Sequence, residues 1–194
     1  MIIVGTDETA VEADLVNGRL ACPNCGSGLR PWGHGIERDV RLVVNTERRR
    51  FRRSICRPCG GTHVLVHEDT LVRRRDGAEV IGLALTAKVR GDGHRRIARV
   101  LGRPASTVRG WLRRFASRAL AIREHFTRWA HVVAVALDDR AVGGSGFSDA
   151  VSAIGMLGMV AVHRFGPRPV WSIASVVTGG GLLCNTSSPF RQPW

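Results

Sequence analysis

Cys22-Pro23-Asn24-Cys25 and Cys56-Arg57-Pro58-Cys59 are the stretches that decide how the first third of this chain folds. Each pair of cysteines is followed by glycine, at Gly26 and Gly60. Glycine permits the tight turn that directs backbone amides at a thiolate sulfur. Four thiolates in two such turns form a closed tetrahedral site for structural zinc. The sequence therefore predicts a zinc ion bound by Cys22, Cys25, Cys56 and Cys59.

The residues around these cysteines predict a zinc ribbon over 20–72. Thirty residues separate Cys25 from Cys56, more than the roughly 15 to 20 of most such sites, so we expect a hairpin to hold the extra length. Apolar alternation predicts three antiparallel strands, at 39–44, 48–55 and 62–67. In a unit this small, the metal contributes folding free energy directly.

Three other side chains in this region have a structural and a functional interpretation. His34 and His63 are candidate metal ligands, but four cysteines already complete a zinc site. We expect both histidines to be structural or exposed to solvent. We expect Trp32 to pack against a thin core rather than to stack on nucleic-acid bases.

The charge of the chain is strongly positive and unevenly distributed. There are 29 Lys and Arg against 16 Asp and Glu, a net charge of +13. Residues 1–21 carry one Arg and four acids, residues 22–129 carry 24 basic and nine acidic side chains, and residues 130–194 carry four and three. A local positive excess neutralises phosphates and releases counterions. Double-stranded DNA is therefore the expected partner.

The run Arg48-Arg49-Arg50-Phe51-Arg52-Arg53 places five Arg around one aromatic residue. A charged run is usually a solvated face, but on a ribbon strand this one would follow a phosphate backbone well. We predict that Arg49, Arg50 and Arg52 contact DNA.

A predicted helix-turn-helix domain occupies residues 76–125. Apolar spacing predicts three helices, at 78–89, 94–101 and 105–116. Asp76 is a candidate cap for the first helix. Gly102 can take the positive φ of a helix end, and Pro104 suits the first turn of the next helix.

The third predicted helix has one apolar and one polar face. Its apolar positions follow the i, i+3, i+4, i+7 spacing of a buried stripe. An ordinary helical hairpin would have the same apolar stripe. However, a solvated helix usually carries charges of both signs. Residues 93–123 contain nine Arg and no acid, which favours a DNA-binding motif. In a helix-turn-helix, this helix faces base edges and the preceding helix crosses the DNA backbone. The expected DNA contacts are Arg95, Arg96, Arg103, Ser106, Thr107, Arg109 and Arg113.

The string GHRRIARVLGRPASTVRGWLRRF, residues 93–115, resembles the helix-turn-helix of insertion-sequence transposases and related regulators. Together with the cysteine turns, Pro31-Trp32-Gly33 and Thr62-His63-Val64-Leu65, it is similar to an actinobacterial zinc-ribbon and helix-turn-helix family associated with mobile elements. The resemblance covers about residues 10 to 125, and residues 182–190 resemble the end of the same family. It implies DNA binding at element ends or at an operator, and no established activity.

The last third of the chain is nearly neutral and apolar. We expect helices at 129–138 and 150–162 and a strand or helix at 171–177, within a packing or dimerisation segment at 126–178. A polar tail is expected at 179–194. The apolar run at 150–162 is shorter than the roughly 20 residues that cross a membrane, so no membrane contact is expected. A homodimer would suit a two-fold symmetric DNA site.

A strand-transferring nuclease needs three carboxylates that hold two metal ions. The only acids after Glu124 are Asp138, Asp139 and Asp149, which we interpret as surface or capping residues. The sequence therefore favours a non-enzymatic DNA-binding protein of a mobile element, a regulator or accessory subunit. The alternative is the DNA-binding part of a truncated or split transposase that acts with a catalytic partner chain.

The sequence predicts an α+β fold that is mostly α. Residues 1–19 are expected to form an acidic arm. Met1 to Val4 is a very short apolar run followed by acids, unlike a secretory signal. We expect the cytoplasm and association with the nucleoid, where paired cysteines bind metal rather than form disulfides.

Overall fold

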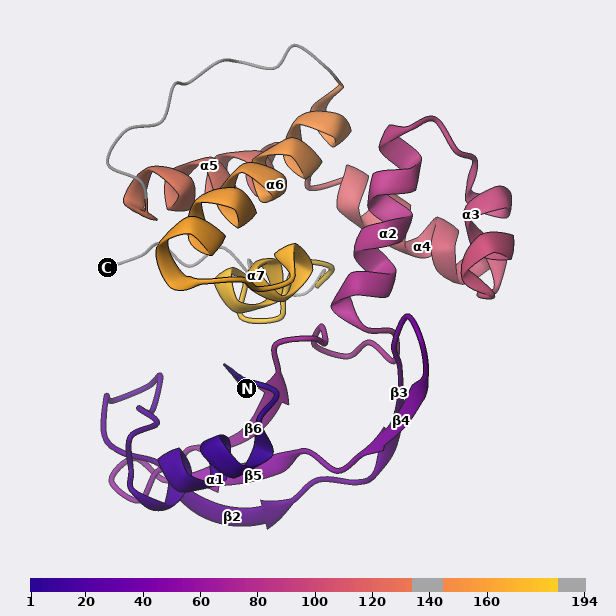
Figure 1. Cartoon of the computed structure of the whole chain (residues 1–194). Helices are drawn as coiled ribbons and strands as arrows, with labels where there is room; N and C mark the ends of the chain where they lie inside the picture. The colour runs from indigo at the N-terminus through magenta and orange to yellow at the C-terminus, as the bar shows by residue number, and fades with distance from the viewer. Residues whose placement is uncertain (134–144, 185–194) are drawn as a thin grey trace.

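A computed structural model, which describes residues 1–133 and 145–184, gives the chain an α+β architecture in two lobes (Figure 1). We call residues 1–77 the sheet lobe and residues 78–184 the helical lobe. The sheet lobe contains β1 Ile2–Val4, α1 Glu8–Val16, β2 Arg30–His34, β3 Arg38–Arg41, β4 Thr46–Arg49, β5 Arg52–Ile55 and β6 Thr62–His67. The helical lobe contains α2 Ala78–Val89, α3 His94–Leu101, α4 Ala105–Ala116, α5 Ala119–Val133, α6 Gly146–Phe165 and α7 Val170–Val177.

Four strands of the sheet lobe form one sheet in the order β1-β6-β5-β2. β5 pairs antiparallel with β2 and β6, whereas β1 pairs parallel with β6. β3 and β4 form a separate hairpin. The prediction for β6 is confirmed, but the predicted strand at 48–55 is two strands. The sequence also missed β2, because Pro31 and Gly33 are uncommon inside strands.

Residues 1–19 belong to the sheet lobe and not to a separate arm. β1 extends the sheet beside β6. Asp7 caps α1 by accepting hydrogen bonds from the backbone N–H groups of Thr9 and Ala10, at 3.0 and 3.1 Å. Val11 and Leu15, one turn apart on α1, are buried in a small core shared with the sheet. These residues are therefore docked on the sheet, through the buried side chains of Val11 and Leu15 and through the ion pair of Glu12 with Arg52.

The helices α2, α3 and α4 have the bounds that the sequence predicts. The prediction that Asp76 caps α2 is wrong. Gly77 is the N-cap of this helix, and no side chain forms a capping hydrogen bond there. Gly102 takes φ 61° at the end of α3, as predicted. Pro104 is the N-cap of α4 rather than part of its first turn.

One apolar core runs through the helical lobe from α2 to α7. The indole of Trp171 in α7 lies directly over Gly82 of α2, where a Cβ atom would overlap the ring. Leu182 and Leu183 are also buried in this core. The predicted boundary between 125 and 126 therefore falls inside a continuous core, within α5. Residues 180–183 of the predicted polar tail are buried, and residues 185–194 lie outside the described residues.

The helix α6 extends over 20 residues with a mean hydropathy of 1.3 in its most apolar window. By length and composition alone it is long enough to cross a membrane. The apolar run at 150–162, which we expected to be too short for a membrane span, is part of this longer helix. The same properties suit a core helix, and a third of that window is buried in the lobe. α5 and α7 pack against this helix (Figure 1).

Candidate metal centre and basic helical surface

Two turns of similar geometry carry the four predicted zinc ligands. The backbone N–H of Cys22 donates to the carbonyl of Ser27, and that of Cys56 donates to the carbonyl of Gly61, each at 2.8 Å. The glycine after each pair has a positive φ, 74° at Gly26 and 69° at Gly60. A residue with a Cβ atom rarely adopts this conformation. The sequence pattern thus encodes the local geometry of both turns.

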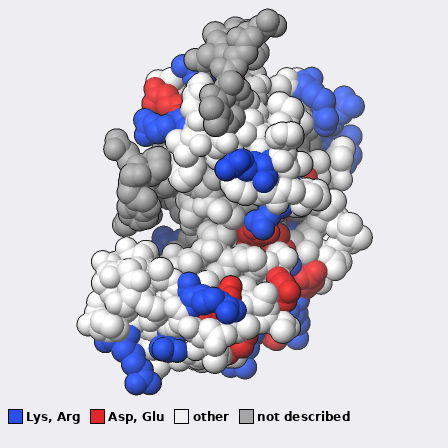
Figure 2. Space-filling view, turned by 60° about the vertical axis from the view of Figure 1, so that its left-hand side comes forward, with Lys and Arg blue, Asp and Glu red and all other residues white. Residues whose placement is uncertain are grey.

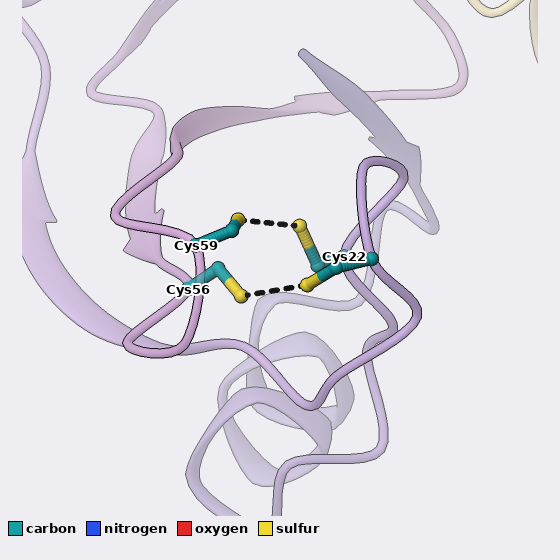
Figure 3. A group of neighbouring side chains, drawn as sticks. Cys22, Cys56 and Cys59 are labelled. Atoms are coloured by element: carbon teal, nitrogen blue, oxygen red, sulfur yellow. Dashed lines mark hydrogen bonds between the residues drawn. The ribbon is translucent and has the colours of Figure 1, made fainter.

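The four sulfur atoms converge between the two turns (Figure 3). They lie within 4.8 Å of one another, with 3.7 Å between Cys22 and Cys59 and 3.4 Å between Cys25 and Cys56. A tetrahedron with zinc–sulfur bonds of about 2.3 Å has sulfur–sulfur edges of about 3.8 Å. A disulfide needs about 2.05 Å. The donor set and the spacing therefore fit a metal ion such as zinc.

The surroundings of Cys25 and Cys56 shift the pKa values of their thiols in opposite directions. Backbone and side-chain hydrogen bonds from Ser27 lower the pKa of Cys25 to about 6. A backbone hydrogen bond from Cys59 lowers the pKa of Cys56, but burial and the neighbouring thiols outweigh it and raise that pKa to about 12. Four thiolates at this spacing repel one another unless a cation neutralises them.

Two nearby side chains differ in their relation to the cysteines. The Nε2 atom of His63 lies 3.5 Å from the sulfur of Cys22 and is buried, so this histidine supports the cluster from β6. His34 is exposed on β2. Trp32, which we expected to pack in the core, is 53% exposed.

The helices α3 and α4 meet at a tight turn and bury their apolar sides. The buried side chains include Ile97 of α3 and Val108, Trp111 and Phe115 of α4. Neither helix has a side-chain cap or an acid in its first turn. Their N-terminal N–H groups and dipoles therefore favour an anion at that end.

The outward sides of α3 and α4 carry exposed polar and cationic side chains, which we call the basic helical surface: Arg95, Arg96, Arg99, Ser106, Arg109 and Arg113. Arg96 is loosely paired with Asp92 at 3.3 Å. In the part of the chain that the structure describes, no carboxylate lies within 4.0 Å of the other four guanidinium groups. Thr107 is half-buried. Cationic side chains also lie over the helical lobe in Figure 2.

Two of the predicted DNA contacts in the sheet lobe are engaged in ion pairs. Arg49 forms two hydrogen bonds of 2.7 Å with Asp69, and its side chain is 10% exposed. Arg52 binds both carboxylate oxygens of Glu12, at 2.7 and 2.9 Å. These carboxylates occupy the donors that phosphates would need. Arg50 remains exposed and donates to a backbone carbonyl at 3.2 Å.

Asp76 and Arg103 connect the two lobes. Asp76 is buried and accepts a 2.6 Å hydrogen bond from Arg103, in the turn between α3 and α4, and a 2.7 Å bond from Arg41 of β3. Arg103, a predicted DNA contact, is therefore engaged in an ion pair. The sequence carries no signal for this link, since the partners of Asp76 lie 35 residues before it and 27 residues after it.

Comparison with models of known protein families, with curated proteins and with solved structures finds no match in any of the three searches.

Proposed function

We propose that the chain is a sequence-specific DNA-binding protein in which α3 and α4 act as a helix-turn-helix. The observation that carries this proposal is the basic helical surface, which has a single loose acidic partner among the described residues, beside two uncapped helix N-termini. In such a motif the second helix enters the major groove and the first contacts the backbone. Arg109 and Ser106 then face base edges, and Arg95 and Arg96 face phosphates.

In this proposal the cysteine cluster is a structural zinc site that completes a zinc ribbon. All four positions are filled by protein thiols, which is the composition of a closed site rather than a catalytic one. Its role is to hold the sheet lobe, and through the pair of Asp76 with Arg103 that lobe fixes the turn between α3 and α4.

Substitution of Arg109 tests the role of α4. We expect Arg109→Ala to relax the preference at one base position and to cost about 1 to 3 kcal/mol on the preferred site, because a bidentate contact to guanine is lost. Arg95→Ala is the matched control, for which we expect all duplexes to bind more weakly by a similar factor. Selection from a random duplex pool, followed by titration at several salt concentrations, measures both effects. Unchanged selectivity in Arg109→Ala would remove α4 from the recognition role.

The resemblance to mobile-element proteins favours a regulator or an accessory subunit as the biological role, in the cytoplasm and close to the nucleoid. The second candidate is the DNA-binding part of a split transposase. Incubation of the protein with an element end and a divalent metal distinguishes them, since nicking or strand joining would support the second. Asp149 is described at the start of α6 beside Arg123, whereas Asp138 and Asp139 lie outside the described residues.

A homodimer would place two copies of α4 on a two-fold symmetric site. Exposed apolar side chains on α5 and α6 offer a surface for such a contact, namely Leu120, Val132, Met159 and Phe165. Light scattering with and without a palindromic duplex tests this assembly.

A further inference from the structure

The two faces of the sheet in the sheet lobe differ in how far they are covered, since Val66 on the second face is buried with Val40 and Phe51. α1 covers the first, where Ser54 and His63 are paired across β5 and β6 and are both buried. Side chains alternate between the faces of a strand. Arg53 and Val64, the next pair along the same strands, therefore lie on the opposite side, which we call the outer sheet face. On this face Val64 is half-buried against the cluster that contains Val66, Arg53 and Ile55 are half-buried, and Thr62 is exposed.

A bulge in β2 adds an aromatic side chain to the outer sheet face. Pro31 pairs with Ser54 and His34 pairs with Arg52, so two residues of β2, Trp32 and Gly33, lie opposite the single residue Arg53. Gly33 has φ 78°, a conformation that glycine adopts without strain. Because Pro31 shares the side of Ser54, Trp32 falls on the outer sheet face beside Arg53. Its indole is 53% exposed.

The arginines of the two faces differ in whether a carboxylate pairs with them. The acids of α1 lie on the covered side, where Glu12 pairs with Arg52. No Asp or Glu occurs in residues 15–36 or 48–67, which supply β2, β5, β6 and both cysteine turns. Within the described residues, no carboxylate lies within 4.0 Å of the guanidinium of Arg53. The outer sheet face thus combines an exposed indole with an unneutralised cation.

We propose that the outer sheet face binds single-stranded nucleic acid, with an unpaired base stacked on Trp32 and the adjoining phosphate paired with Arg53. An aromatic platform beside a cation is the arrangement that holds single strands, because every base has a π-face and every nucleotide carries a charge. A duplex cannot use this site, since its bases are already stacked. A protein partner would have to supply a carboxylate of its own to pair with Arg53. The proposal is independent of α4, which lies in the other lobe.

The test uses the full-length, zinc-loaded protein and a labelled oligothymidylate of about 12 nucleotides, with a duplex of the same length beside it. We expect Trp32→Ala to bind the single strand about tenfold more weakly and Trp32→Phe to recover most of the loss, because phenylalanine still stacks. Arg53→Ala should reduce both the affinity and its salt dependence. Ile36→Ala is the matched control, since Ile36 is 92% exposed on the loop after β2.

Two further measurements keep the result unambiguous. Zinc stoichiometry and the unfolding midpoint verify that each variant is folded. Arg109→Ala should leave single-strand binding unchanged while it alters duplex selectivity, so the two proposals can fail separately. The proposal is overturned if the wild-type protein does not bind the single strand, if Trp32→Ala binds it equally well, or if Trp32→Ala weakens duplex binding by the same factor.

Discussion

The two lobes achieve stability in different ways. Among the described residues, the helical lobe contributes 26 of the 27 buried apolar residues of one cluster, with Leu71 as the other, whereas the sheet lobe has two clusters of seven and three. Small units rarely bury enough apolar surface to fold alone. The sheet lobe compensates with four converging thiols and with buried or half-buried ion pairs such as Arg49 with Asp69. The comparison teaches that in this chain polar and metal-binding groups replace a large core in the sheet lobe.

Removal of the metal is expected to have the largest effect and would separate the lobes. Cys56→Ser should abolish zinc binding and unfold the sheet lobe, because binding to such sites contributes about 10 kcal/mol or more. The helical lobe should keep its helical circular dichroism, since its core contains none of these cysteines. Mass spectrometry measures the zinc content. Cys184→Ser is the control and should retain one zinc ion. An unchanged zinc content in Cys56→Ser would refute the site.

Loss of the Asp76 carboxylate should have an intermediate effect and would break the link between the lobes. Asp76→Ala leaves two guanidinium groups without their shared partner, of which that of Arg103 is 16% exposed. We expect a loss of about 3 kcal/mol, as for other buried pairs that lose one member. Urea unfolding measures it. Asp14→Ala removes an exposed pair with Arg19 and should change stability by less than about 1 kcal/mol. Equal effects of the two variants would show that Asp76 does not couple the lobes.

The smallest expected effect is a pH dependence within the sheet lobe. Burial, followed by the nearby charge of Arg49, lowers the pKa of His67, although Asp69, Glu8 and Glu47 oppose the shift. The unfolded chain therefore takes up a proton before the folded chain does, and stability should fall as the pH falls below about 6.5. His67→Gln should flatten this slope. Paired unfolding curves at equal zinc loading measure the difference, and parallel curves would contradict the assignment.

Glu12 gives the stability of the sheet lobe a second pH dependence, at lower pH than that of His67. The hydrogen bonds from Arg52 lower the pKa of its carboxyl group. Its contribution to stability is therefore present above about pH 4.5 and is lost as the pH falls further, which separates it from the effect of His67. Glu12→Gln should leave the slope near pH 6 intact.

Much of the local structure could be predicted because it depends on residues close in sequence. The bounds of α2, α3 and α4 follow from apolar spacing and from glycine at Gly102. The approach of the four cysteines follows from two short turns with glycine at fixed positions. The exposed positions of Arg95, Arg109 and Arg113 follow from the buried stripe on the other side of their helices.

Only the tertiary structure decided which charged groups are free and which are paired. Arg49, Arg52 and Arg103 looked equivalent to Arg109 in sequence, but each meets a carboxylate at least 20 residues away along the chain. The tertiary structure also decided the environments of Asp76, which caps no helix, and of Trp32, which is exposed at a bulge opposite Arg53. The sequence alone determined the helices and turns, because short-range backbone and apolar preferences act within a few residues. Partners across lobes and strands depend on how the elements pack, and no local pattern encodes that packing.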